Sequence, residues 1–184
     1  MKTSAVNIRA KAEVYARVLL EAAQASDRVF VLTGELAELL ATVRGSLELR
    51  SALSEATFPE QAKKAIIAEI FSDYAPELLA TFEVMVERGD LATLPRVCEF
   101  YYALAEEALG AIILDVSTVV PLDEELRQQI ITKYSSQLGR GVLLREYIDP
   151  DLIGGIVLAS HGKRIDASVS SQLENARQVL SLSQ

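Results

Sequence analysis

Apolar residues recur at helical spacing through the first 109 residues of the chain. Spacings of three and four place one apolar face on each successive segment, and the first such face comprises Ile8, Ala12, Tyr15, Leu19 and Ala22. Gly45, Pro59, Pro76 and Gly89 interrupt the pattern and mark the ends of segments. Residues 1–109 are therefore predicted to form a compact six-helix bundle with short connections.

Three polar residues are predicted to cap helices of this bundle. Ser26 precedes the second helical segment and Asp90 precedes the last. Thr57 begins the run Thr-Phe-Pro-Glu, which has the spacing of a capping box. Pro76 suits a first helical turn, because the N–H that proline lacks is not needed there.

The period of the pattern changes after Gly110. Ile112, Leu114 and Val116 alternate with their neighbours, as in a strand. Helical spacing returns in the apolar face of Leu126, Ile130, Tyr134 and Leu138. Apolar runs at 142–148 and 156–165 predict a strand and a hairpin that turns at His161-Gly162. Ser168 is expected to cap a final helix. We predict the α+β class: a helical bundle over 1–109, followed by a small α/β domain over 110–184.

The composition narrows the class of protein. The net charge is −8, with 11 basic and 17 acidic residues in 1–109 and 7 and 9 in 110–184, so neither part has the basic character of a nucleic-acid-binding surface. No apolar run approaches the ~20 residues of a membrane span, so no direct membrane insertion is expected. A single cysteine excludes an internal disulfide.

Few residues offer catalytic, cofactor or metal chemistry. Gly154-Gly155 lies before an apolar run and not before a helix, which favours a turn with positive φ over a phosphate-binding loop. Cys98 lies on an apolar helical face and His161 lies at a predicted hairpin tip, and these two are too few for a zinc site. We therefore expect no enzyme activity, no catalytic residue, no cofactor and no metal.

Several stretches of the chain resemble one family. Residues 149–156, Asp-Pro-Asp-Leu-Ile-Gly-Gly-Ile, are the most specific, and Ile-Asp-Ala-Ser-Val follows at 165–169. Further similar stretches are Tyr-Ala at 15–16, Glu-Arg-Gly-Asp-Leu at 87–91 and Val-Val-Pro-Leu at 119–122. Together they resemble the delta subunit of F-type ATP synthase, called the oligomycin-sensitivity-conferring protein in mitochondria.

The resemblance implies a non-catalytic subunit of the peripheral stalk. Such a subunit links the catalytic α/β head to the membrane-anchored b subunits and resists torque, so that proton transport is coupled to ATP synthesis. It would be present as one copy in a hetero-oligomeric complex, peripheral on the cytoplasmic face of the bacterial cell membrane. The bundle would bind N-terminal helices of the α subunits, and the α/β domain would bind the C-terminal ends of the b subunits.

By the same resemblance, an α-subunit helix would lie between the first and fifth helices of the bundle. The candidate groove residues are Tyr15, Ala16, Leu19, Leu79, Phe82 and Val86. The same periodicity also describes ordinary core residues. We expect Phe82→Asp to weaken binding of an α-subunit peptide while the bundle stays folded.

Five positions depart from the family pattern. Glu146 replaces an aliphatic residue, and the other four replace glycine and arginine positions, which reduces the basic character of the last helix: Ala167, Ser170, Ser171 and Gln172. Two other hypotheses remain open. One is a free-standing helical adaptor for another amphipathic peptide, and the other is a small enzyme that uses Asp149, Asp151 and Asp166.

Overall fold

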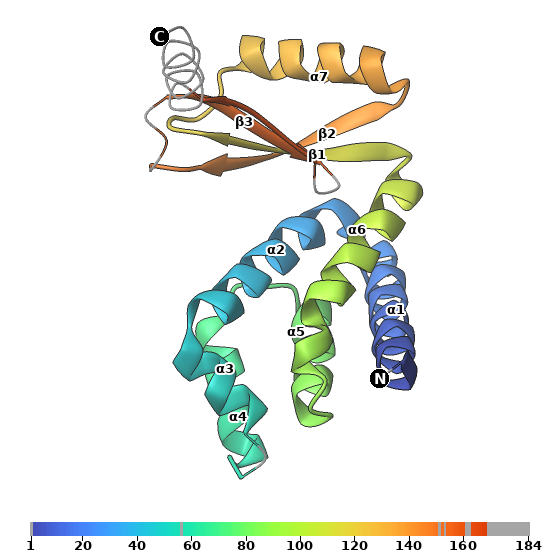
Figure 1. Cartoon of the computed structure of the whole chain (residues 1–184), viewed down its shortest axis with the longest axis vertical. Coiled ribbons are helices and arrows are strands. Elements are labelled where there is room, and N and C mark those ends of the chain that lie inside the picture. Colours follow the sequence, from blue (N-terminus) through green and yellow to red (C-terminus); the bar gives the residue numbers. More distant parts are fainter. Residues whose placement is uncertain (1, 56, 151, 153, 161–162, 169–184) are drawn as a thin grey trace, which may run out of the picture. The chain divides into compact units, whose positions relative to one another are not determined.

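The chain divides into two compact units, Met1–Leu109 and Gly110–Gln184. The computed structural model describes residues 2–55, 57–150, 152, 154–160 and 163–168 (Figure 1). Helices make up the described part of the first unit, and the second combines a sheet with one described helix, so the mixed α+β class is confirmed.

The first unit is built from helices joined by short turns. In chain order they are α1 (Lys2–Ala25), α2 (Val29–Gly45), α3 (Leu47–Ser54), α4 (Glu60–Ile70), α5 (Pro76–Glu87), the 3-10 turn η1 (Leu91–Thr93) and α6 (Leu94–Leu109). The helix α6 packs along α1 and α2, and α5 contacts both α1 and α4 (Figure 1). Gly89 follows α5 with φ of 67°, a conformation that glycine adopts without strain.

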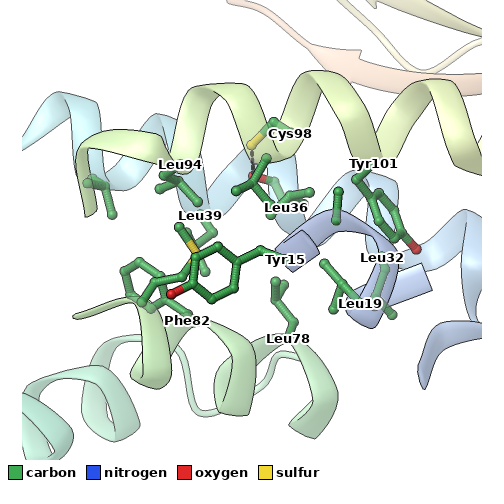
Figure 2. Close-up of a cluster of buried hydrophobic side chains, with 14 of the residues drawn as sticks. Tyr15, Leu19, Leu32, Leu36, Leu39, Leu78, Phe82, Leu94, Cys98 and Tyr101 are labelled. Carbon is green, nitrogen blue, oxygen red and sulfur yellow. Dashed lines mark hydrogen bonds between the residues drawn. The ribbon is translucent and has the colours of Figure 1, made fainter. Parts of the chain in front are cut away.

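The core of this unit lies where α1, α2, α5 and α6 face one another. Its largest buried side chains include Leu19, Leu32, Leu36, Leu78, Phe82 and Tyr101, drawn in Figure 2. The Tyr101 hydroxyl donates a hydrogen bond to the Val29 carbonyl over 3.0 Å, so the buried phenol has a partner. Cys98, on the apolar face of α6, is a buried free thiol, as its position in the pattern indicates.

None of the three side chains predicted to cap a helix of the first unit makes a cap hydrogen bond. The N-cap of α2 is Arg28, and Ser26 Oγ instead donates to Glu77 Oε1 over 2.6 Å. Pro59 occupies the N-cap of α4, and Thr57 Oγ1 donates to Glu55. Asp90 occupies the N-cap position of η1, just before α6, but its carboxylate binds side chains of α1 instead of the backbone.

The described part of the second unit is a four-stranded sheet with one helix. Its elements are β1 (Ala111–Thr118), α7 (Glu124–Leu138), β2 (Gly141–Ile148), β3 (Gly155–Ser160) and β4 (Lys163–Ser168), and the strand order is β2-β1-β3-β4. The pair β1–β2 is parallel and connected through α7, whereas β3 is antiparallel to β1 and β4. The predicted hairpin is confirmed. The helix expected after Ser168, with Ser170 and Ser171, lies outside the described residues.

The helix α7 covers one face of this sheet (Figure 1). Ile130 on α7 packs with Leu114, Val116, Val142 and Leu158. Asp123 caps α7 by accepting the Leu126 N–H over 2.7 Å. Gly155 begins β3 with φ of 86°, as expected for a turn glycine.

Candidate partner-binding surface

The six predicted groove residues are mostly interior in the isolated chain. Five of them are buried, Leu79 is half-buried, and all six belong to or pack against the core of the first unit: Tyr15, Ala16, Leu19, Phe82, Val86 and Leu79. Figure 2 shows Tyr15, Leu19 and Phe82 within the same apolar cluster. These residues therefore lie in the core, beneath the surface of the first unit. Their direct contact with a partner stays a prediction.

Phe82 shows why burial matters for testing such a groove. Its side chain is 1% exposed, and its ring meets the Phe71 ring edge-on with centroids 5.7 Å apart. A carboxylate at this position would be buried without a partner, at a cost of several kcal/mol. The expectation that Phe82→Asp leaves the bundle folded therefore finds no support in the structure, and exposed residues give a sharper test.

The outer side of α1 carries two exposed apolar residues. Val14 is 61% exposed and Val18 is 53% exposed, and their spacing of four places them on one face. Val14 lines a shallow groove of 470 Å³ between α1 and the segment after α5, which we call the α1–α5 groove. Its lining residues are Asn7, Ala10, Lys11, Val14, Tyr15, Arg88 and Asp90.

Asp90 joins the two sides of the α1–α5 groove. Its Oδ1 accepts a hydrogen bond from Lys11 Nζ over 2.6 Å, and its Oδ2 accepts one from the Tyr15 hydroxyl over 3.0 Å. Burial, followed by the Asp90 carboxylate, raises the pKa of the Tyr15 phenol. The phenol therefore stays protonated and donates, which fixes α1 against the chain that follows α5.

Sequence reasoning missed the exposed half of this surface. Val14, Val18, Lys11 and Arg88 lie outside the apolar periodicity that identified the core-facing residues. A usable signal was present, since Val14 and Val18 form an apolar pair on the otherwise polar side of α1. Asp90 was recognised only as a possible helix cap.

The second unit has an apolar hollow at one end of β1. Its volume is 510 Å³, and it is lined mainly by Thr118, Val119, Val120, Pro121, Leu122, Leu126, Gly155 and Ile156. Val120 is 66% exposed and Leu126 is 38% exposed. Asp123 also borders the hollow, but its carboxylate is engaged in capping α7. This hollow, which we call the β1-end hollow, suits an apolar contact more than polar chemistry.

The part of the chain that the structure describes holds no group of three or more His, Cys, Asp or Glu side chains placed to bind a metal ion. Of the carboxylates considered for an enzyme, Asp149 is described, Asp151 is not, and nothing is described of the Asp166 side chain. His161 also lies outside the described residues. No described helix is long and apolar enough to span a membrane.

Comparison with known proteins decides among the three hypotheses. The sequence profile of the ATP synthase delta (OSCP) subunit family matches residues 12–180, which span both units. The chain belongs to this family. ATP synthase subunit delta of Gloeothece citriformis is 32% identical over 94% of this chain and 95% of its own length. The subunit delta of Anaeromyxobacter dehalogenans is 33% identical over 90% of this chain and 94% of its own length.

The fold agrees with a solved structure. A chain of the mitochondrial ATP synthase hexamer of Toxoplasma gondii matches with a TM-score of 0.50 and 18% identity, covering 92% of this chain and 96% of that chain. Family membership makes this delta-family chain a non-catalytic peripheral-stalk subunit of an ATP synthase. The peripheral-stalk hypothesis is therefore confirmed over the free-standing adaptor and the carboxylate enzyme.

Proposed function

We propose that the two units of this chain bind different parts of the ATP synthase. The helices α1 to α6 act as the six-helix bundle that binds N-terminal helices of the α subunits of the catalytic head. The unit over 110–184 binds the C-terminal ends of the b subunits. One copy in the complex then transmits the reaction torque from the head to the membrane-anchored b subunits, peripheral on the cytoplasmic face of a bacterial membrane.

The exposed apolar side of α1 is the observation that carries the first half of this proposal. An amphipathic helix binds by placing apolar residues at helical spacing against a complementary apolar surface. Val14 and Val18 offer such a surface beside the α1–α5 groove, and the buried Tyr15 and Leu19 hold α1 in place beneath them. Arg88 borders the groove and favours an acidic residue on the incoming helix, whereas Lys11 is paired with Asp90.

The test is a titration of the full chain with the N-terminal peptide of the cognate α subunit. Val18→Asp places a charge on the exposed apolar face and should weaken binding about tenfold or more, equivalent to about 1.4 kcal/mol. Val31→Asp on α2 is the matched control, because Val31 is 49% exposed and lies on a different helix from Val14 and Val18. Circular dichroism should show both variants folded. Equal affinity of the two variants would exclude this face of α1 from the contact.

The β1-end hollow supports the second half of the proposal. Val120 and Leu126 are exposed apolar residues at its rim, as expected where an apolar chain end docks. Leu126→Asp should lower the affinity of the full chain for a peptide that carries the C-terminal end of the cognate b protein. Leu138→Asp on the same helix is the control, since Leu138 is 45% exposed and does not line the hollow. If both variants bind the peptide like the wild type, the b subunits dock elsewhere.

A further inference from the structure

The strand β2 forms one edge of the described sheet. The strand order is β2-β1-β3-β4, so β2 pairs on one side only among the described residues (Figure 1). All eight of its residues, Gly141–Ile148, pair with β1 in an unbroken parallel register. The other side of β2 therefore presents a row of backbone N–H and C=O groups for which the described sheet holds no strand.

A hydrogen bond just after β2 shows which backbone groups point outward. The Asp149 N–H donates to the Thr118 carbonyl over 2.8 Å, so the backbone of Asp149 faces β1. Backbone groups alternate between the two sides of a strand, so the odd-numbered residues of β2 also face β1 and the even-numbered ones point away. The outward N–H and C=O groups are those of Val142, Leu144, Glu146 and Ile148.

The edge at β2 lacks the usual protection against pairing with another chain. Natural sheets protect an edge with lysine, proline, a bulge or a very short strand, and β2 has none of these. Its arginine, Arg145, binds Asp115 of β1, with Nε 2.6 Å from Oδ1 and Nη2 2.9 Å from Oδ2. Its glutamate, Glu146, binds Arg127 of α7 over 2.6 Å. The opposite edge strand, β4, begins with Lys-Arg. Of the two edges, β2 is the one open to a further strand.

Apolar residues border the β2 edge on the face of the sheet that α7 covers. Leu144 packs against the core of the second unit, and Ile148 is 53% exposed. A strand added beside β2 would place alternate side chains next to these two, because same-face residues of neighbouring strands contact each other. Apolar side chains at those places would extend the core and cover Ile148. The edge therefore fits an extended segment with an apolar residue at every second position.

We propose that an extended segment at the C-terminal end of a b subunit adds to this sheet as a further strand beside β2. This inference rests on the proposed binding of the b subunits by the second unit. The edge adjoins the β1-end hollow, since Ile148 pairs with Thr118 and Thr118 lines that hollow. One chain end would then fill the hollow and continue along β2. Backbone hydrogen bonds give affinity in such strand addition, and the alternate side chains give specificity.

The first test titrates the full chain with the peptide that carries the C-terminal end of the cognate b protein. Glu146→Pro removes one outward N–H and leaves the ladder to β1 intact, since an edge strand tolerates proline where the N–H faces solvent. Glu146→Ala is the matched control, because it also loses the contact with Arg127 but keeps the N–H. Glu146→Pro should bind the peptide about tenfold more weakly than Glu146→Ala. Equal affinity of the two variants would overturn the proposal.

Amide hydrogen exchange followed by NMR tests the edge in the unsubstituted chain. Saturating peptide should slow exchange at Leu144, Glu146 and Ile148 about tenfold or more, and far more than at Leu143 and Arg145, which already face β1. Peptide binding without this alternating pattern would contradict strand addition. Protection of the outward amides that rises with the concentration of the chain alone would assign the edge to a second copy and would also overturn the proposal.

Leu126→Asp separates this inference from the proposed function. The peptide can bind more weakly to Leu126→Asp while the two Glu146 variants bind it equally and the outward amides stay unprotected. In that outcome the b subunit docks at the hollow and not along β2. Failure of the wild-type chain to bind the peptide would instead reject both the docking of the b subunits on this unit and the added strand.

Discussion

The Glu35 carboxylate on α2 holds the N-cap residue of α5. Its Oε2 accepts the Ala75 backbone N–H over 2.7 Å, and its Oε1 accepts a hydrogen bond from Arg28 over 2.9 Å. Ala75 is fully buried, so water cannot replace this acceptor. In a capping box, an acidic side chain in the first turn accepts the N–H of the N-cap residue. Glu35 makes the same contact from another helix, 40 residues away in sequence.

Removing this cap should destabilise the helical unit. Glu35→Ala leaves the buried Ala75 N–H without its acceptor, which costs roughly 1–3 kcal/mol of unfolding free energy. Glu38→Ala is the control, because Glu38 is exposed on the same helix and accepts only a long hydrogen bond of 3.3 Å from Tyr74. Urea unfolding followed by circular dichroism compares the two. Equal midpoints would show that Glu35 contributes no cap.

Alkaline pH should destabilise the chain through tyrosines that are partly or fully buried. Burial, followed by the Glu38 and Glu35 carboxylates, raises the pKa of Tyr74 to about 12. The unfolded phenol loses its proton near pH ~10, so the folded state binds more protons above that pH and stability falls as pH rises toward ~12. Below pH ~10 this contribution is fully present.

The measurement is the unfolding free energy from about pH 9 to about pH 12. Tyr74→Phe removes one titrating phenol and should reduce the loss of stability over this range. Glu38→Gln should reduce it in part, because only the second cause of the raised pKa is removed. Curves parallel to that of the wild type would assign the alkaline loss to other groups, such as Tyr101, whose pKa burial also raises.

The division of the chain into helices and strands could be predicted because each element keeps its own period. The change after Gly110 is visible in the sequence, because Ile112, Leu114 and Val116 alternate with their neighbours. The strand β1 includes all three residues. The side-chain partners of two predicted caps could not be predicted locally. Ser26 and Asp90 have the right residue types, but their side chains bind Glu77, Lys11 and Tyr15, which only the tertiary fold brings near.

The candidate surface could be predicted only in part, for a related reason. Tyr15 and Phe82 recur at helical spacing, and this spacing is the same for groove residues and for core residues. The fold buries them both. Val14 and Val18 are apolar residues on an otherwise polar helix face, so they are the sequence signal that indicates a binding surface. The contact between Arg9 and Phe100 could not be predicted, because the two residues meet only through tertiary packing.

The family departure at Glu146 should be compensated by Arg127. Arg127 Nε donates to Glu146 Oε1 over 2.6 Å and Nη2 donates to Oε2 over 3.2 Å, so α7 is tied to the edge strand β2. A double-mutant cycle of Arg127→Ala and Glu146→Ala should give a small favourable coupling that falls at high salt. A coupling of zero would make Glu146 an unpaired surface charge. Glu146→Leu should change stability by less than ~0.5 kcal/mol, because an aliphatic residue covers the same face.

Two glycines next to open space should respond to the same substitution with opposite sign. Gly139 ends α7 with φ of 65°, whereas Gly45, the last residue of α2, has no positive φ, and an added Cβ meets no atom within 4 Å at either position. Gly139→Ala should therefore cost about 1 kcal/mol of unfolding free energy through backbone strain alone. Gly45→Ala should stabilise by about 0.5–1 kcal/mol, because alanine favours the helix and restricts the unfolded chain.

Asn at position 139 tolerates positive φ and should recover part of the loss, which separates backbone strain from the addition of a side chain. Equal effects of alanine at the two positions would show that the left-handed turn after α7 does not limit stability.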